Sequence, residues 1–67
     1  MNYLSFKNLN IGTLFFYNGN KWKKTSSKTA FIIEFEKTFY FRMNDICYVS
    51  NEERMEQINN IFKQKEV

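Results

Sequence analysis

The sequence has 67 residues, one cysteine, no histidine and a net charge of +3. A single cysteine excludes an internal disulfide, and without histidine neither the Ser–His and Cys–His catalytic pairs nor the usual zinc-ligand sets can be assembled. Side-chain packing must therefore stabilise the domain, and the sequence supplies eight Phe, four Tyr and one Trp for it.

The positive charge is concentrated in the first half of the chain. Residues 1–33 carry five lysines and no acid, whereas residues 34–67 carry five bases and seven acids, a net charge of −2. No apolar run approaches the roughly 20 residues that span a bilayer, and the N-terminal segment lacks the apolar stretch of a signal peptide. The lone Cys47 is typical of a reducing compartment, so we expect a soluble, cytoplasmic protein. The amino-acid usage indicates an AT-rich genome.

The first predicted element is a β-hairpin around Asn18-Gly19. This dipeptide tolerates the two positive φ angles of a type I′ turn, and apolar or aromatic residues flank it on both sides. A two-residue loop pairs Phe15 with Trp22 and Thr13 with Lys24 on one face. A three-residue loop would instead pair Phe16 with Trp22. We favour the two-residue loop, because it gathers Leu14, Phe16, Lys21 and Lys23 on the opposite face.

A second hairpin is expected over residues 31–43. Phe31, Ile33 and Phe35 alternate with Ile32, Glu34 and Glu36, and Phe39, Phe41 and Met43 alternate with Tyr40 and Arg42. A three-residue loop at 36–38 pairs Phe35 with Phe39, Ile33 with Phe41 and Phe31 with Met43, which stacks all the apolar residues on one face. This register places Glu34 beside Tyr40 on the outer face.

The last predicted elements are a short strand and a helix. Residues 46–49 read as a strand, and Ser50 followed by Glu53 is a capping-box pattern that begins a helix over about residues 51–64. An apolar stripe of Met55, Ile58, Ile61 and Phe62 marks its buried side. The whole chain, 1–67, is then one α+β domain: an SH3-like, five-stranded antiparallel barrel or sheet within about residues 11–49, with one C-terminal helix.

A set of turn and core residues within 11–49 is similar to that of small, mostly uncharacterised tailed-phage proteins. The matching positions are Ile11-Gly12, Phe15, Tyr17, Asn18-Gly19, Trp22, Lys24, Ser26, Thr29-Ala30 and Phe39-Tyr40-Phe41. The resemblance carries no catalytic residues. It implies an accessory protein made inside the host cell, where such proteins often bind host machinery.

No residue pattern points to catalysis. Glu34 and Glu36, about 7 Å apart on one strand face, have a spacing that suits paired carboxylates or a cation, but charged residues are ordinary on an outward strand face. Cys47 within an apolar strand is read as a small buried side chain rather than a nucleophile. Two glycines cannot form a glycine-rich phosphate loop. We expect no enzyme activity, no cofactor and no metal.

Two binding surfaces are compatible with the sequence. Four lysines and an aromatic lie within residues 21–28, and lysines with stacking rings are used by single-strand binders; lysines also protect edge strands from aggregation. In addition, side chains alternate along residues 14–17, so either Leu14 and Phe16 or Phe15 and Tyr17 lie on the outer face. Unless residues 4–9 cover this pair, it forms an exposed apolar surface that suits contact with a protein.

The resemblance, together with the exposed aromatic residues, implies a small phage-type accessory protein that inhibits or redirects a host protein by stoichiometric binding, with host takeover or anti-defence as its expected role. The alternative is a nucleic-acid-binding module that uses the lysine and aromatic strip. No membrane partner is expected, and the oligomeric state is open. The expected contact residues are Phe16, Tyr17, Lys21, Trp22, Lys23, Lys24 and Lys28.

Overall fold

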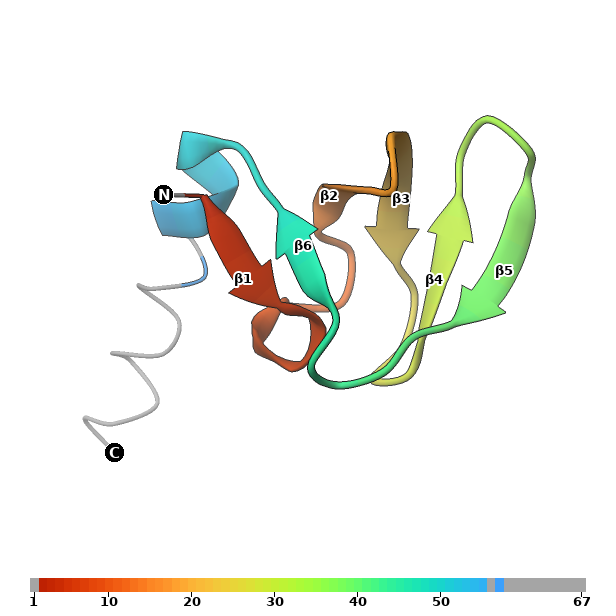
Figure 1. The fold of residues 1–67 in the computed structure, drawn as a ribbon, viewed down its shortest axis with the longest axis horizontal. Coiled ribbons are helices and arrows are strands. Elements are labelled where there is room, and N and C mark those ends of the chain that lie inside the picture. The colour runs from red at the N-terminus through yellow and green to blue at the C-terminus, as the bar shows by residue number, and fades with distance from the viewer. Residues whose placement is uncertain (1, 56, 58–67) are drawn as a thin grey trace.

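The computed structural model describes residues 2–55 and 57 of the chain, and its main feature is one open antiparallel sheet (Figure 1). Six strands lie in the order β1-β6-β2-β3-β4-β5, so β1 and β5 are the edges. A 3-10 turn, η1, follows the first strand. The bounds are β1 Tyr3–Ser5, η1 Phe6–Asn8, β2 Leu14–Tyr17, β3 Asn20–Lys24, β4 Thr29–Ile32, β5 Lys37–Tyr40 and β6 Ile46–Tyr48. The expected mostly β, antiparallel architecture followed by a helix is confirmed, and five strands, β2–β6, lie within residues 11–49 as predicted. The sheet gains a sixth strand, β1, from outside that range, and of the two predicted forms it is the open sheet and not a barrel.

The first hairpin, β2–β3, has the predicted register. Phe15 pairs with Trp22 and Tyr17 with Asn20, across the two-residue loop. Asn18 and Gly19 both have positive φ, 54° and 80°, as a type I′ turn requires. The right-handed twist of such a turn matches that of the flanking strands, which explains why the dipeptide fixes the register.

The second hairpin, β4–β5, differs from the prediction. Ala30 pairs with Phe39 and Ile32 with Lys37, across a loop of residues 33–36 that Glu36 closes with a φ of 53°. The inward residues of β4 are Ala30 and Ile32, because β4 also pairs with β3, where Lys24 and Trp22 point inward. Neighbouring β3 thus sets the face of β4, and the hydrophobic alternation of the hairpin alone gave the wrong parity. Glu34 and Glu36 lie on this loop and not on a strand face.

The N-terminal strand was not predicted. β1 is three residues long and pairs with β6 from the other end of the described chain, with Tyr3 opposite Tyr48 and Leu4 opposite Cys47. β6 in turn pairs with β2, so it lies between two strands from the N-terminal third of the chain. The predicted strand at residues 46–49 is confirmed, with β6 ending one residue earlier.

A helix begins where the capping pattern places it. Residues 51–55 and 57 are helical, the Ser50 hydroxyl accepts a hydrogen bond from the Glu53 N–H at 3.2 Å, and the Arg54 N–H bonds to the Ser50 carbonyl. Met55 is exposed, contrary to its place in the predicted apolar stripe. The remainder of the predicted helix, including Ile58, Ile61 and Phe62, lies outside the described residues.

The core lies on one face of the sheet, under η1 and the loop that leads into β6. Phe41 is its centre, because its ring contacts four other aromatic rings at centroid distances of 4.8–5.6 Å: Phe6, Phe15, Tyr17 and Trp22. Phe6 and Phe15 are fully buried. Aromatic packing of this kind gives a small domain a large buried area from few residues.

Candidate functional site

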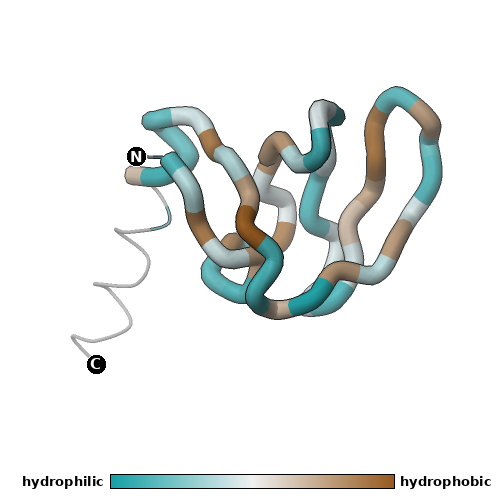
Figure 2. Tube along the Cα trace, in the orientation of Figure 1, coloured by the Kyte–Doolittle hydropathy of each residue, from teal (hydrophilic) through white to brown (hydrophobic). Residues whose placement is uncertain are grey.

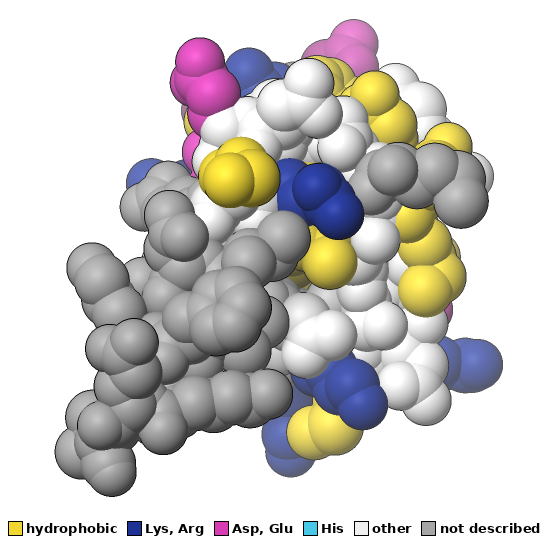
Figure 3. Space-filling view, turned by 90° about the vertical axis from the view of Figure 1, so that its left-hand side faces the viewer, with side chains coloured by type: hydrophobic (Ala, Val, Ile, Leu, Met, Phe, Trp, Pro, Cys, Tyr) yellow, Lys and Arg dark blue, Asp and Glu magenta, His cyan; other side chains and the backbone are white. Residues whose placement is uncertain are grey.

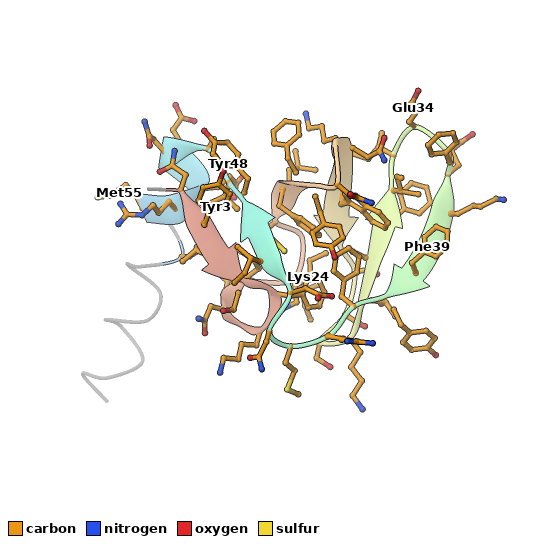
Figure 4. The ribbon with its side chains drawn as sticks, in the orientation of Figure 1. Tyr3, Lys24, Glu34, Phe39, Tyr48 and Met55 are labelled. Atoms are coloured by element: carbon orange, nitrogen blue, oxygen red, sulfur yellow. The ribbon has the colours of Figure 1, made fainter. Side chains whose placement is uncertain are left out.

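The opposite, outer face of the sheet carries exposed aromatic side chains. The strand registers place one residue from each of β1, β6 and β2 in a row, because Tyr3 pairs with Tyr48 and Tyr48 pairs with Phe16. These side chains are 56%, 42% and 47% exposed. We call Tyr3, Tyr48 and Phe16 the aromatic row. Figure 4 shows Tyr3 and Tyr48 lying together on neighbouring strands.

The three rings form a continuous group. The Tyr3 and Tyr48 rings meet edge to face with centroids 5.2 Å apart, and the Tyr48 and Phe16 rings are 6.5 Å apart and tilted by 57°. With neighbouring strands about 4.8 Å apart, the row extends roughly 10 Å across the sheet. A row of exposed rings of this length is comparable in size to the aromatic groups on which two or three bases stack in sheet-type nucleic-acid binders.

Two lysines continue the row on β3. Lys21 pairs with Phe16 and Lys23 with Leu14, and both lysines are exposed. Lys23 also pairs with Phe31 on β4. Among the six described strands, no residue that the register places on this face is acidic. In the space-filling view from the β1 end, the visible acidic side chains gather near the top of the molecule (Figure 3). The outer face is therefore apolar and positive.

The structure divides the contact residues predicted from sequence into two groups. Phe16, Lys21, Lys23 and Lys28 are exposed, the first three on the outer face and Lys28 in the β3–β4 loop. Trp22 is 7% exposed, and its Nε1–H donates to the Tyr17 carbonyl at 3.0 Å. The Tyr17 ring packs on Phe41 at 5.0 Å. Trp22 and Tyr17 thus belong to the inner face of the sheet.

Lys24 is a buried structural residue and does not lie on the strip. Its Nζ donates to the carbonyls of Phe6 at 2.8 Å and Leu9 at 2.6 Å and lies 4.4 Å from the centre of the Phe6 ring. The ammonium therefore ties η1 to β3. Burial lowers the pKa of Lys24 below the ordinary lysine value, and the charge interaction with Cys47 opposes this shift. Of the four predicted contact lysines, Lys21, Lys23 and Lys28 are therefore the exposed ones.

Cys47 has the environment of an unreactive thiol. It is fully buried, and its S–H points to the Asp45 carbonyl at 3.8 Å. Burial, with a smaller contribution from the Asp45 charge, raises the pKa of Cys47 to about 12, although Lys24 acts in the opposite direction. A thiol with this pKa is almost entirely protonated at neutral pH, so it is a poor nucleophile.

A polar pocket of about 190 Å³ lies between the loop before β2 and the start of the helix. The buried Gln57 closes one side of it: its Oε1 accepts from the Asn10 N–H at 2.6 Å, and its Nε2 donates to the Thr13 hydroxyl at 3.0 Å. These bonds dock the helix on the loop and use the amide's polar atoms within the chain. Within residues 2–55 and 57, no group of His, Cys, Asp or Glu has the arrangement of a metal site.

Sequence reasoning missed two members of the aromatic row, Tyr3 and Tyr48. Each was seen only as one residue of a short segment, and their proximity follows from the pairing of β1 with β6. The available signal was the alternation of side chains along the strand, because Tyr48 stands between two apolar residues, Cys47 and Val49. Both of these are fully buried in the structure, and Tyr48 lies on the other face.

Comparison with known proteins identifies no relative: no protein-family model matches the chain, and neither a curated protein nor a solved structure does. The resemblance to tailed-phage proteins stays a prediction. In the described part of the chain, no helix has the length and apolar character to cross a bilayer.

Proposed function

We propose that this protein is a non-enzymatic binding module whose outer sheet face binds single-stranded nucleic acid. The observation that supports this most directly is the aromatic row, Tyr3, Tyr48 and Phe16, continued by Lys21 and Lys23 on a face whose described strands carry no acidic residue. Rings offer stacking surfaces to bases, and lysines offer charge to phosphates.

The pairing of charged with apolar residues favours nucleic acid over an apolar protein surface. Lys21 and Lys23 stand directly opposite Phe16 and Leu14, with Cβ atoms about 5 Å apart. An apolar protein partner that covered the rings would also have to desolvate both ammonium groups, which is costly without a counter-charge. A polynucleotide brings base rings and phosphates at a comparable spacing, so it satisfies both kinds of side chain together.

A single strand fits better than a duplex. The row is formed by rings on a sheet surface, and stacking requires bases whose faces are accessible, as in an unpaired strand. A duplex would present its phosphates to Lys21 and Lys23 and leave Tyr3 and Tyr48 without a stacking partner.

Stoichiometric binding of a host protein is the second candidate. It is supported by exposed apolar side chains on the β4–β5 hairpin, away from the aromatic row: Ile33, Phe35, Phe39 and Tyr40. Under this proposal the protein is a phage-type accessory protein that inhibits host machinery in the host cytoplasm. An SH3-like arrangement is likewise a proposal, supported by the four consecutive strands β2–β5 with β6 returning beside β2.

The test is a fluorescence-anisotropy titration of labelled single- and double-stranded oligonucleotides at two salt concentrations. We expect the wild type to bind single strands at tens of micromolar or below, the range of non-specific binders. Replacing Lys21 and Lys23 together by Glu removes two phosphate contacts, so the slope of log affinity against log salt should become shallower by about 1.4. Tyr48→Leu keeps an apolar side chain but removes the ring, and should weaken binding about tenfold.

Two controls separate the candidates. Lys7→Glu with Lys37→Glu makes the same change of charge away from the outer face and should leave the salt slope unchanged. The protein-binding candidate uses the β4–β5 hairpin, so Tyr48→Leu should leave binding to a host protein unchanged, whereas it should weaken stacking on the aromatic row. Wild-type protein that binds no oligonucleotide in this range, or binds with equal affinity after all these changes, would refute the nucleic-acid proposal.

A further inference from the structure

The far edge of the sheet, β5, is an open strand with every residue exposed. Lys37, Thr38, Phe39 and Tyr40 are all solvent-accessible, and Tyr40 is 85% exposed. The other edge strand, β1, is one residue shorter, and two of its residues are partly buried. Figure 1 places β5 at the end of the sheet opposite β1, and Figure 2 shows hydrophobic segments on both limbs of its hairpin. An edge strand presents unpaired N–H and C=O groups to which a further strand can pair.

The directions in which the β5 backbone groups point follow from the hydrogen bonds on either side of β4. The Phe41 N–H donates to the Lys28 carbonyl, so residue 41 faces β4, and alternation makes residues 39 and 37 face β4 as well. On the other side of β4, the Ile33 N–H donates to Lys21, which agrees with this parity. The N–H and C=O groups of Thr38 and Tyr40 therefore point to the open edge.

The geometry points to a second copy of this chain as the partner of that edge, joined β5 to β5 in antiparallel orientation about a two-fold axis at Phe39. This register pairs Thr38 of each copy with Tyr40 of the other. Each such pair exchanges two N–H···O=C bonds, so all the outward backbone groups of β5 find a partner. A two-fold interface of this kind is self-complementary and closes as a dimer.

The neighbouring registers satisfy fewer groups. Pairing Thr38 with Thr38 would place Glu36 opposite Tyr40, but the Glu36 N–H already donates to the Ile32 carbonyl. Pairing Tyr40 with Tyr40 would place Arg42 opposite Thr38, but the Arg42 N–H already donates to the Asp45 carboxylate at 2.9 Å. The register about Phe39 uses only groups that turn to the edge.

The charged residues that flank β5 and the exposed Phe39 ring also favour the register centred on Phe39. Glu36 and Arg42 are both exposed and flank β5, each three residues from Phe39, so antiparallel pairing brings the Glu36 end of one strand beside the Arg42 end of the other, twice by symmetry. At about 3.4 Å per residue these pairs lie roughly 10 Å on either side of the axis. On the inner face the two Phe39 rings, each 48% exposed in the single chain and packed on Trp22 at 5.8 Å, lie opposite one another.

Dimerisation would extend one outer face into the other. Two six-stranded sheets joined at β5 form one continuous sheet, and the aromatic rows lie at its two distant ends. The dimer does not depend on nucleic-acid binding, because no residue of the aromatic row takes part in it.

The experiment is sedimentation equilibrium of the full chain from about 1 µM to about 1 mM, the range that detects weak association. We expect a reversible dimer. Arg42→Glu turns two attractive pairs into two repulsive ones and should weaken the dimer about tenfold, and the double change Glu36→Arg with Arg42→Glu should restore the affinity to within about threefold. Lys7→Glu, the same kind of change on η1, should have no effect.

Two backbone measurements complete the test. Thr38→Pro removes an edge N–H while leaving the bonds to β4 intact, and should weaken the dimer at least tenfold. The amide protons of Thr38 and Tyr40 should exchange more slowly as protein concentration rises, whereas that of Phe39, bonded to β4, should not change. A chain that stays monomeric, or a dimer indifferent to Arg42→Glu and to Thr38→Pro, overturns the proposal. Protection of these amides only after another protein is added would reveal a different occupant and overturn it equally.

Discussion

Lys24 offers the sharpest test of how this small domain is held together. Its side chain is 4% exposed, yet it carries an ammonium group that reaches under the sheet to the carbonyls of Phe6 and Leu9. Lys24→Met keeps the length and the apolar stem of the side chain while removing the charge and its donors. We expect this substitution to lower the free energy of unfolding by about 2–4 kcal/mol.

The magnitude is the balance of opposing effects. Hydrogen bonds to a charged group contribute about 1.5–3 kcal/mol each, and a partly desolvated contact of an ammonium with a ring adds about 1 kcal/mol. Removing a buried charge recovers part of its desolvation cost, which keeps the total below the sum of the contacts. In Lys24→Met the Phe6 carbonyl still accepts a hydrogen bond from the Leu9 N–H at 3.1 Å, so the main effect is the hydrogen bond that the Leu9 carbonyl loses.

The assay is urea unfolding followed by the fluorescence of Trp22, the only tryptophan and a buried one. At about 0.05–0.15 kcal/mol per residue, a domain of this length has roughly 3–10 kcal/mol of stability, so the loss should be plain. Lys23→Met is the matched control: it changes the neighbouring, exposed lysine and should shift stability by less than about 0.5 kcal/mol. A Lys24→Met protein as stable as the wild type would show that apolar packing replaces the ammonium without loss, and would refute this account of η1.

Two further predictions concern Cys47 and Ser50. The pKa of Cys47 rises from 9.0 to about 12 on folding, so as pH increases from 9 to 12 the unfolded chain loses its thiol proton first and stability falls, by at most about 1.4 kcal/mol per pH unit. Cys47→Ala removes the thiol and with it this loss of stability. If the urea midpoint falls as much between pH 9 and pH 11 in Cys47→Ala as in the wild type, the assignment to Cys47 is contradicted. Ser50→Ala removes the hydrogen bond to the Glu53 N–H and should lower the free energy of unfolding by about 0.5–2 kcal/mol. The control, Ser27→Ala in an exposed loop, should leave it almost unchanged. Equal urea midpoints for the two variants would mean that Ser50 does not cap the helix.

The two hairpins show what local sequence can and cannot predict. At Asn18-Gly19 the turn chemistry allows only a short list of loops, and alternation on both sides agrees with one of them, so the register of β2–β3 was predictable. At residues 33–36 no glycine marks the turn, and Glu36 adopts the left-handed conformation at some cost. The alternating Phe31, Ile33 and Phe35 then suggested an inner face that the structure does not have.

The inner face of β4 and the burial of Lys24 depend on contacts between residues far apart in the sequence. The inward position of Ala30 gives almost no hydrophobic signal, and it becomes clear only when β4 is placed beside Lys24 on β3. The role of Lys24 was hidden for the same reason, because a lysine between other lysines reads as part of an exposed strip. Its burial depends on η1, which brings the Phe6 and Leu9 carbonyls to its ammonium.

The composition of the outer face argues against a purely structural role. Aromatic pairs on an uncovered sheet face do stabilise it, by roughly 0.2–1 kcal/mol for each cross-strand pair, and this alone could account for Tyr3 beside Tyr48. Stability, however, would be served better by acidic partners opposite the two β3 lysines, since opposite charges across a strand pair attract. The residues found there are Phe16 and Leu14. A face whose described strands set lysines beside exposed rings without an acidic residue forgoes local stability, and it retains the two features that an anionic, ring-bearing ligand requires.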